Sequence, residues 1–131
     1  MQAKAIRKKF ERVPPEVAAF GSSESETHVS IGKRYEVHAL SVYSHVVCLQ
    51  VVNDVEVIAW LPAWFFEISD PTIPDDWNCN VFSGDLQMIL GPDFVSRDED
   101  SYRRMVEMHP ESVDRFWRRT KMRLVRPAGE T

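Results

Sequence analysis

The stretch RYEVHALSVYSHVVCLQVVNDVEVIAW, residues 34–60, decides the fold. It is rich in β-branched and aromatic residues, and Asn53-Asp54 has the composition of a hairpin turn. The pattern predicts strands at 34–43, 45–52 and 55–60. Along the first strand the apolar positions alternate from Tyr35 to Ala39 and then shift by one residue. Such a shift predicts a bulge or strong bend, as a small curled sheet requires.

The sequence that follows predicts a second hairpin and then helices. The runs 77–82 and 86–90 flank Ser83-Gly84-Asp85, which suits a hairpin loop. Ser96 and Glu99 have the spacing of a capping box, which marks a helix start. Pro110 suits the first turn of a further helix. We therefore expect a helical pair over 96–124, followed by a tail over 125–131.

The sequence that precedes the first strand predicts a helix. Ala3, Ile6, Phe10 and Val13 recur at helical spacing, and Pro14-Pro15 would end the helix. At 131 residues the chain is the size of one ordinary domain. We therefore expect a single α+β domain over 1–131: an N-terminal helix within 1–20, then a small, strongly bent antiparallel sheet or partly open barrel over 33–92, and two C-terminal helices.

The stretch LPAWFFEISDPTIPDDW, residues 61–77, joins the two hairpins. Pro62 and Pro71 exclude a central strand, so 61–71 is expected to be an edge strand or a turn-bounded bridge. Three interpretations are open for this aromatic and acidic corner: an active-site wall, a docking surface, or a barrel corner with some rings in the core. As a docking surface it offers aromatic anchors and carboxylates. The candidate partner-binding residues are Trp64, Asp70, Asp75, Asp76, Trp77 and Asp85.

Charge is strongly segregated along the chain. Residues 1–34 carry seven basic and four acidic side chains, residues 35–100 carry one and twelve, and residues 101–131 carry eight and four. The acidic middle would repel phosphates, so we expect no nucleic-acid partner. The pattern favours a basic protein partner.

No set of residues predicts catalysis, a metal or a cofactor. His38 and His45 are separated by seven positions, which places them on opposite faces of a straight strand. No nucleophile motif or phosphate-binding loop occurs. Acid–base chemistry by the carboxylates near Trp77 is conceivable, but turn and surface roles account for each of them.

The cysteines and the hydropathy pattern bear on the compartment. Cys48 and Cys79 lack C-x-x-C spacing and are expected to be two buried thiols rather than a disulfide. The N-terminus lacks the apolar core of a signal peptide, and polar residues interrupt the run 46–60, which excludes a membrane span. We therefore expect a cytoplasmic protein.

The motifs follow one another in a recognisable order: a strand headed by Tyr35, a hairpin, the corner 61–77, the run ILGPDFV, and a helix with Tyr102, Glu107 and Pro110. This order resembles a widespread group of short bacterial proteins of unassigned activity. Some members of that group are suspected to be immunity proteins of secreted or contact-delivered toxins. The resemblance covers about residues 33–120, and it implies no catalytic residue.

The leading hypothesis is a non-enzymatic, protein-binding domain, most concretely an immunity-type inhibitor that masks a basic toxin domain with its acidic segment. Opposite charge would speed the encounter, and a buried aromatic ring would slow release. The main alternative is a small enzyme or ligand-binding barrel whose pocket is the aromatic and acidic corner. A third is a regulator that touches nucleic acid through the basic C-terminal helix.

Overall fold

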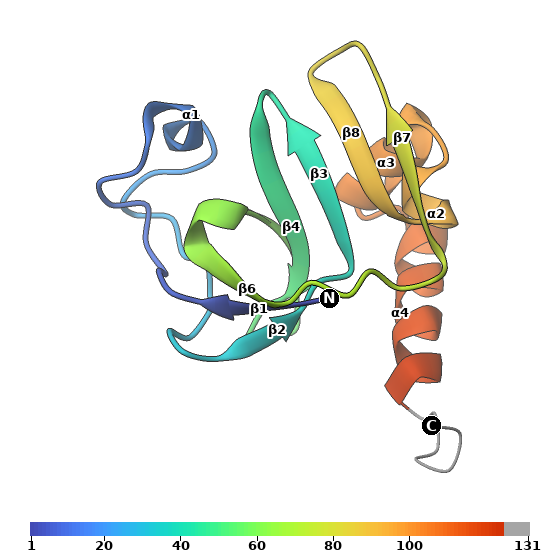
Figure 1. Cartoon of the computed structure of the whole chain (residues 1–131), viewed down its shortest axis with the longest axis horizontal. Coiled ribbons are helices and arrows are strands. Elements are labelled where there is room, and N and C mark those ends of the chain that lie inside the picture. The colour runs from blue at the N-terminus through green and yellow to red at the C-terminus, as the bar shows by residue number, and fades with distance from the viewer. Residues whose placement is uncertain (125–131) are drawn as a thin grey trace.

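The chain forms an α+β fold in which two antiparallel sheets are joined to a group of helices (Figure 1). The computed structural model describes residues 1–124, and side chains up to residue 121. The predicted tail, 125–131, lies outside the described residues. None of the helices in the described part is long and apolar enough to cross a bilayer.

The elements follow one another along the chain as β1 Gln2–Ala5, α1 Pro15–Ala18, β2 Arg34–Glu36, β3 Ala39–Tyr43, β4 Val46–Val52, β5 Ile58–Pro62, η1 Ala63–Phe65, β6 Phe66–Asp70, β7 Trp77–Val81, β8 Leu86–Pro92, α2 Asp93–Ser96, α3 Glu99–Val106 and α4 Pro110–Leu124. The larger sheet has the order β5-β4-β3-β8-β7, and the smaller has the order β2-β1-β6. Every strand pair is antiparallel.

Hairpins build the larger sheet as the sequence predicted. β3 and β4 are joined through Ser44 and His45, which both have positive φ, 46° and 67°. A two-residue turn of this kind matches the natural twist of paired strands. In the next turn the side-chain oxygen of Asn53 accepts hydrogen bonds from the backbone N–H groups of Val55 (3.1 Å) and Val57 (3.0 Å). Local turn chemistry therefore sets both hairpins.

The prediction of an N-terminal helix is wrong. Residues 2–5 form β1, the central strand of the smaller sheet, and only the four residues of α1 are helical. Ala3 and Ala5 are both fully buried while Gln2 is exposed, which is the two-residue period of a strand. A short isolated helix is marginally stable, whereas β1 bonds to a strand on each side.

The chain leaves one sheet and enters the other just before the place where the sequence predicted a bulge or bend. Val37 and His38 separate β2 from β3. The N–H of Val37 donates to the carbonyl of Met1 (2.9 Å), which precedes β1 of the smaller sheet, and that of His38 donates to the carbonyl of Gln50 (2.8 Å) in the larger sheet. The structure thus has two sheets where one bent sheet or partly open barrel was expected.

The two C-terminal helices are present, but they begin differently from the prediction. Asp98, not Ser96, caps α3, and its side chain accepts from the N–H of Ser101 (2.7 Å). Ser96 is buried, and its hydroxyl donates to the carbonyl oxygens of Gly91 (2.9 Å) and Pro92 (3.0 Å). Figure 1 shows α3 and α4 together beside β7 and β8, with α1 on the opposite side of the molecule.

Two cores hold these layers together. The larger core includes Leu49, Val51 and Phe65, together with both alanines of β1. The smaller lies between the larger sheet and the helices, where Ala39 and Ile58 meet Val95, Met105 and Phe116. The helices therefore cover one face of the larger sheet, and this arrangement positions the site described next.

Candidate binding pocket

The structure places Trp77 in the interior. It begins β7, pairs with Pro92 and is 7% exposed, within the larger core. Trp77 is therefore not available as an exposed anchor, contrary to the expectation from the sequence. The physical reason is that burying an aromatic ring withdraws roughly 150–250 Å² of surface from water.

Trp64 is half-buried, and a cation of the same chain occupies one face of its ring. The Arg7 guanidinium carbon lies 4.3 Å from the ring centroid, and Arg7 also donates a hydrogen bond to the Trp64 carbonyl. A ring face already covered by a guanidinium is less open to a partner than the sequence suggested.

The corner carboxylates have three different environments. Asp70 accepts a hydrogen bond from the N–H of Thr72 (3.0 Å), which lowers the pKa of its carboxyl group. Asp75 is exposed. Asp76 accepts two hydrogen bonds from Arg119 of α4. The corner therefore anchors its own turn and a helix, and of these three candidates only Asp75 is exposed with no hydrogen bond in the described part of the chain.

Asp85, the remaining candidate, belongs to a different place. It lies in the β7–β8 loop, and its carbonyl accepts from the N–H of Ser44 (2.8 Å) in the β3–β4 turn. Its side chain lines a pocket between the larger sheet and α3, with a cavity volume of about 790 Å³. Such a volume is in the range of small-molecule sites.

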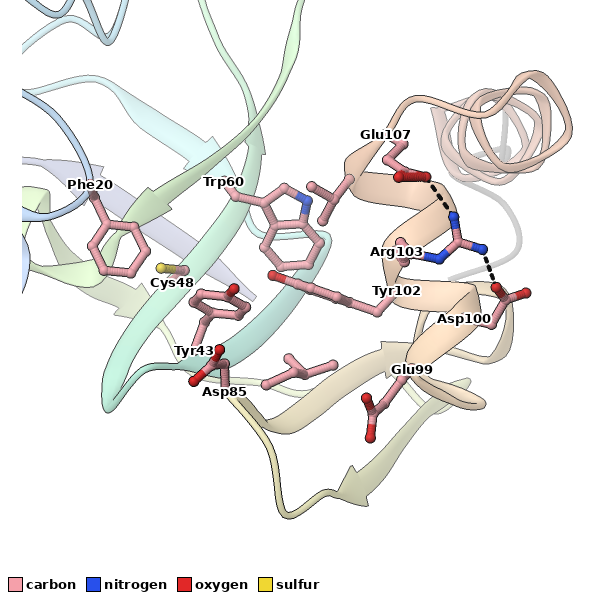
Figure 2. Close-up of a pocket in the computed structure, with 12 residues that line it drawn as sticks. Phe20, Tyr43, Cys48, Trp60, Asp85, Glu99, Asp100, Tyr102, Arg103 and Glu107 are labelled. Carbon is pink, nitrogen blue, oxygen red and sulfur yellow. Dashed lines mark hydrogen bonds and ion pairs between the residues drawn. The ribbon is translucent and has the colours of Figure 1, made fainter.

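Four aromatic rings from separate segments line this pocket: Phe20 after α1, Tyr43 at the end of β3, Trp60 of β5 and Tyr102 of α3. Trp60 and Tyr102 are 5.3 Å apart, and Phe20 and Tyr43 are 6.4 Å apart, measured between ring centroids. Both pairs are edge-to-face. Figure 2 shows Tyr102 reaching from α3 toward the sheet, where Trp60 and Tyr43 lie.

Strand register explains why Trp60 faces the helices. Gln50 pairs with Trp60 on one side and with Ala39 on the other, so the three side chains share one face of the sheet. Ala39 belongs to the smaller core beneath α3 and α4, and Trp60 packs against that core. Trp60 therefore stands beside the helix that supplies Tyr102.

Four carboxylates and one guanidinium surround the rings. Arg103 bonds to Glu107 (2.7 Å) and to Asp100, and Asp100 also pairs with Arg104 (2.9 Å). Asp85 and Glu99 are exposed, and neither makes an ion pair or side-chain hydrogen bond within the described part of the chain. The pocket therefore has an acidic rim with two carboxylates available to a cation.

Burial controls the ionisation of two side chains that line the pocket. Burial raises the pKa of the Cys48 thiol to about 12, so it stays protonated and is a poor nucleophile near neutral pH. Burial also raises the pKa of Tyr102. Within residues 1–121 no three His, Cys, Asp or Glu side chains are grouped to hold a metal ion.

Sequence reasoning found Asp85 but missed the rings and Glu99. The sequence placed Tyr102 within a helix and Glu99 in a helix cap, and it assigned neither to a site. The signal that connects them is an exposed acidic residue three positions before an aromatic one at a helix start, which is too common to mark a site by itself. No protein-family model, curated protein or solved structure matches the chain.

Proposed function

We propose that this chain is a non-enzymatic domain that binds a basic protein partner at the acid-rimmed aromatic pocket. The proposal rests on one observation: two carboxylates without an ion-pair partner in the described residues, Asp85 and Glu99, lie at a cavity lined by four aromatic rings. Aromatic rings supply the buried contacts that dominate interfaces, and opposite charge speeds the encounter.

The most concrete form of this function is an immunity-type inhibitor that masks a basic toxin domain in the cytoplasm. The acidic middle of the chain and the order of its motifs support this form. The proposal moves the expected interface from the corner at 61–77 toward the pocket, which shares only Asp85 with the candidate set. A docking role for Asp70 and Asp75 stays a prediction.

Growth rescue in a bacterial host tests the proposal. The chain is co-expressed with a panel of basic toxin domains, including any encoded beside its own gene. We expect rescue from at least one toxin, co-purification of that toxin, and slower association for the Asp85→Asn/Glu99→Gln variant, with a weaker salt dependence. The absence of rescue by the wild-type chain across the panel would count against the inhibitor.

Two matched pairs of substitutions complete the design. Glu26→Gln/Glu56→Gln removes the same charge from exposed positions outside both the pocket lining and the corner, and should leave association unchanged. Asp70→Asn/Asp75→Asn reports on the corner. If the corner pair slows association and the pocket pair does not, the interface is the one that the sequence predicted.

The volume of the pocket favours a second candidate, a small-molecule-binding domain. About 790 Å³ lined mainly by apolar and aromatic side chains suits a ligand of drug-like size. A thermal-shift screen of metabolites distinguishes the two. A specific metabolite that raises the melting temperature of the wild-type chain, but not of a Trp60→Ala variant, would favour this candidate.

A further inference from the structure

We infer that the pocket receives an arginine side chain of the protein partner, with the guanidinium among the aromatic rings and beside Asp85 and Glu99. The inference rests on the proposed function and names the chemical group that the site recognises. Four features of the described residues carry it: the rings, the free carboxylates, the position of Arg103, and the way this chain stacks its own arginines.

The rings form a suitable surface for a planar cation. Trp60 and Tyr102 meet at an interplanar angle of 60°, and Phe20 and Tyr43 meet at 82°. In pairs of this geometry each ring keeps a face that its partner does not cover. Cations are attracted to ring faces, most strongly to that of tryptophan. Because all four rings line one cavity, an entering cation lies close to several of them.

The unpaired carboxylates supply the counter-charge. Figure 2 shows Asp85 beside Tyr43 and Glu99 on the first turn of α3. A guanidinium that enters between them would form charge-assisted hydrogen bonds, which are stronger than neutral ones. An apolar side chain would use the rings but leave both carboxylates without a partner.

The chain's own arginine does not take this place. Arg103 lines the cavity, but its guanidinium is held by Glu107 and Asp100. Figure 2 shows it extending along α3 between these two carboxylates. Within residues 1–121 no other cation pairs with Asp85 or Glu99, so the inference takes the complementary group from the partner.

Contacts elsewhere in the chain favour arginine over lysine. Arg7 stacks on Trp64 at 4.3 Å, and Arg115 lies over Phe94 at 5.4 Å. A guanidinium is planar and weakly hydrated, so it stacks on rings while its edge bonds to carboxylates. Lys33 also lies over a ring, that of Tyr35 at 5.2 Å, so lysine is the nearest competitor.

The inference is tested by titrating short peptides into the full chain. The probes are acetyl-Ala-Arg-Ala-amide and its lysine and citrulline counterparts, because citrulline keeps the shape of arginine without its charge. The readout is the NMR signal of the Trp60 indole N–H, assigned by a Trp60→Phe variant. We expect a saturable shift with the arginine peptide, affinity at least about threefold lower with lysine, and no shift with citrulline.

Two variants place the binding site. Asp85→Asn/Glu99→Gln should lower the affinity for the arginine peptide at least about fivefold. Glu26→Gln/Glu56→Gln should leave it unchanged. Both pairs alter exposed side chains without a hydrogen bond in the described structure, and unchanged signals elsewhere in the spectrum check that each variant is folded.

Three results would overturn the inference: no shift of the Trp60 signal with the arginine peptide, equal binding of citrulline, or full affinity in the Asp85→Asn/Glu99→Gln variant. Failure here is distinct from failure of the proposed function. If no peptide binds but a toxin is still neutralised in the growth assay, the proposed inhibitor function is supported and arginine binding in the pocket is contradicted. If the arginine peptide binds but no basic protein does, arginine recognition by the pocket is supported and the proposed inhibitor function is contradicted.

Discussion

Arg119 of α4 binds Asp76 in the turn before β7 through two hydrogen bonds, Nε to Oδ2 at 2.6 Å and Nη2 to Oδ1 at 2.7 Å. The Arg119 side chain is only 15% exposed, whereas that of Asp76 is 56% exposed. The contact ties the last helix to the aromatic and acidic corner. It is therefore a structural contact at a carboxylate that the sequence assigned to docking.

Replacing Arg119 by lysine should destabilise the fold by about 1 kcal/mol, because lysine cannot keep the two-point contact. Urea unfolding measures the loss. Arg118→Lys is the matched control, since Arg118 pairs with Asp114 on the exposed surface of the same helix. If both variants lose equal stability, the contact with Asp76 contributes nothing special.

Asp54 should make stability depend on acid pH. It accepts hydrogen bonds from Lys33 (2.6 Å), Ser30 (2.6 Å) and Tyr35 (2.8 Å), and these lower its pKa from 3.8 to about 2. A carboxyl group with a lowered pKa in the folded state stabilises above its unfolded pKa, and the contribution disappears as pH falls through the folded value. The stabilisation should thus be lost between about pH 5 and pH 2.

The Asp54→Asn variant tests this dependence. At pH 7 we expect it to be less stable than the wild type by about 1 kcal/mol, a value reduced for the partial exposure of the pair. The difference should shrink toward acid pH, as measured by unfolding at several pH values. Glu56→Gln is the control in the same turn. A difference that is constant with pH would contradict the assignment to Asp54 ionisation.

The two cysteines should react at very different rates. Cys48 is buried and its pKa is raised to about 12, whereas Cys79 is exposed on β7, although both thiols were expected to be buried. A maleimide reagent at neutral pH should modify one thiol in the native protein and both in denaturant. The Cys79→Ser variant should then resist modification until it unfolds. Rapid native labelling of Cys48 would mean that the pocket region opens readily.

Gly91→Ala should destabilise the junction of β8 with α2. A Cβ atom at Gly91 would lie 2.8 Å from the Cβ of Ala39 and 3.0 Å from Cγ1 of Val95. Forcing an extra carbon into a packed site costs about 1–3 kcal/mol. Gly84→Ala is the control, because nothing lies within 4 Å of the added atom there. Thermal unfolding should show a lower melting temperature for Gly91→Ala and an unchanged one for Gly84→Ala.

Local patterns in the sequence determined most of the strands and both longer helices. The alternation over 34–60 and the turns at Ser44 and Asn53 specify hairpins through contacts between near neighbours, so they can be predicted without the rest of the chain. The capping-box spacing at 96–99 and Pro110 likewise mark the starts of two helices. The predicted cap of the first of these helices was wrong by two residues. The Ser96 hydroxyl donates to a buried carbonyl, and Asp98 caps α3 instead.

Only the tertiary structure decided whether the N-terminal residues form a strand or a helix. Ala3, Ile6 and Phe10 satisfy helical spacing, and Ala3 and Ala5 satisfy strand spacing equally well. The choice depends on β2 and β6, which bond to β1 from both sides and lie far away in the sequence. Long-range pairing overrides a local preference when it satisfies more backbone groups.

The same reason separates the corner from the pocket. The sequence determined that aromatic rings and carboxylates are concentrated in residues 61–77, but not that Trp77 would be buried or that Asp76 would bind Arg119. The pocket unites residues from two loops, four strands of the larger sheet and α3, which only the packing of α3 on that sheet brings together. Which residues lie close together in a folded chain depends on which faces of the helices and sheets pack together. A local sequence pattern does not determine which face an element packs against.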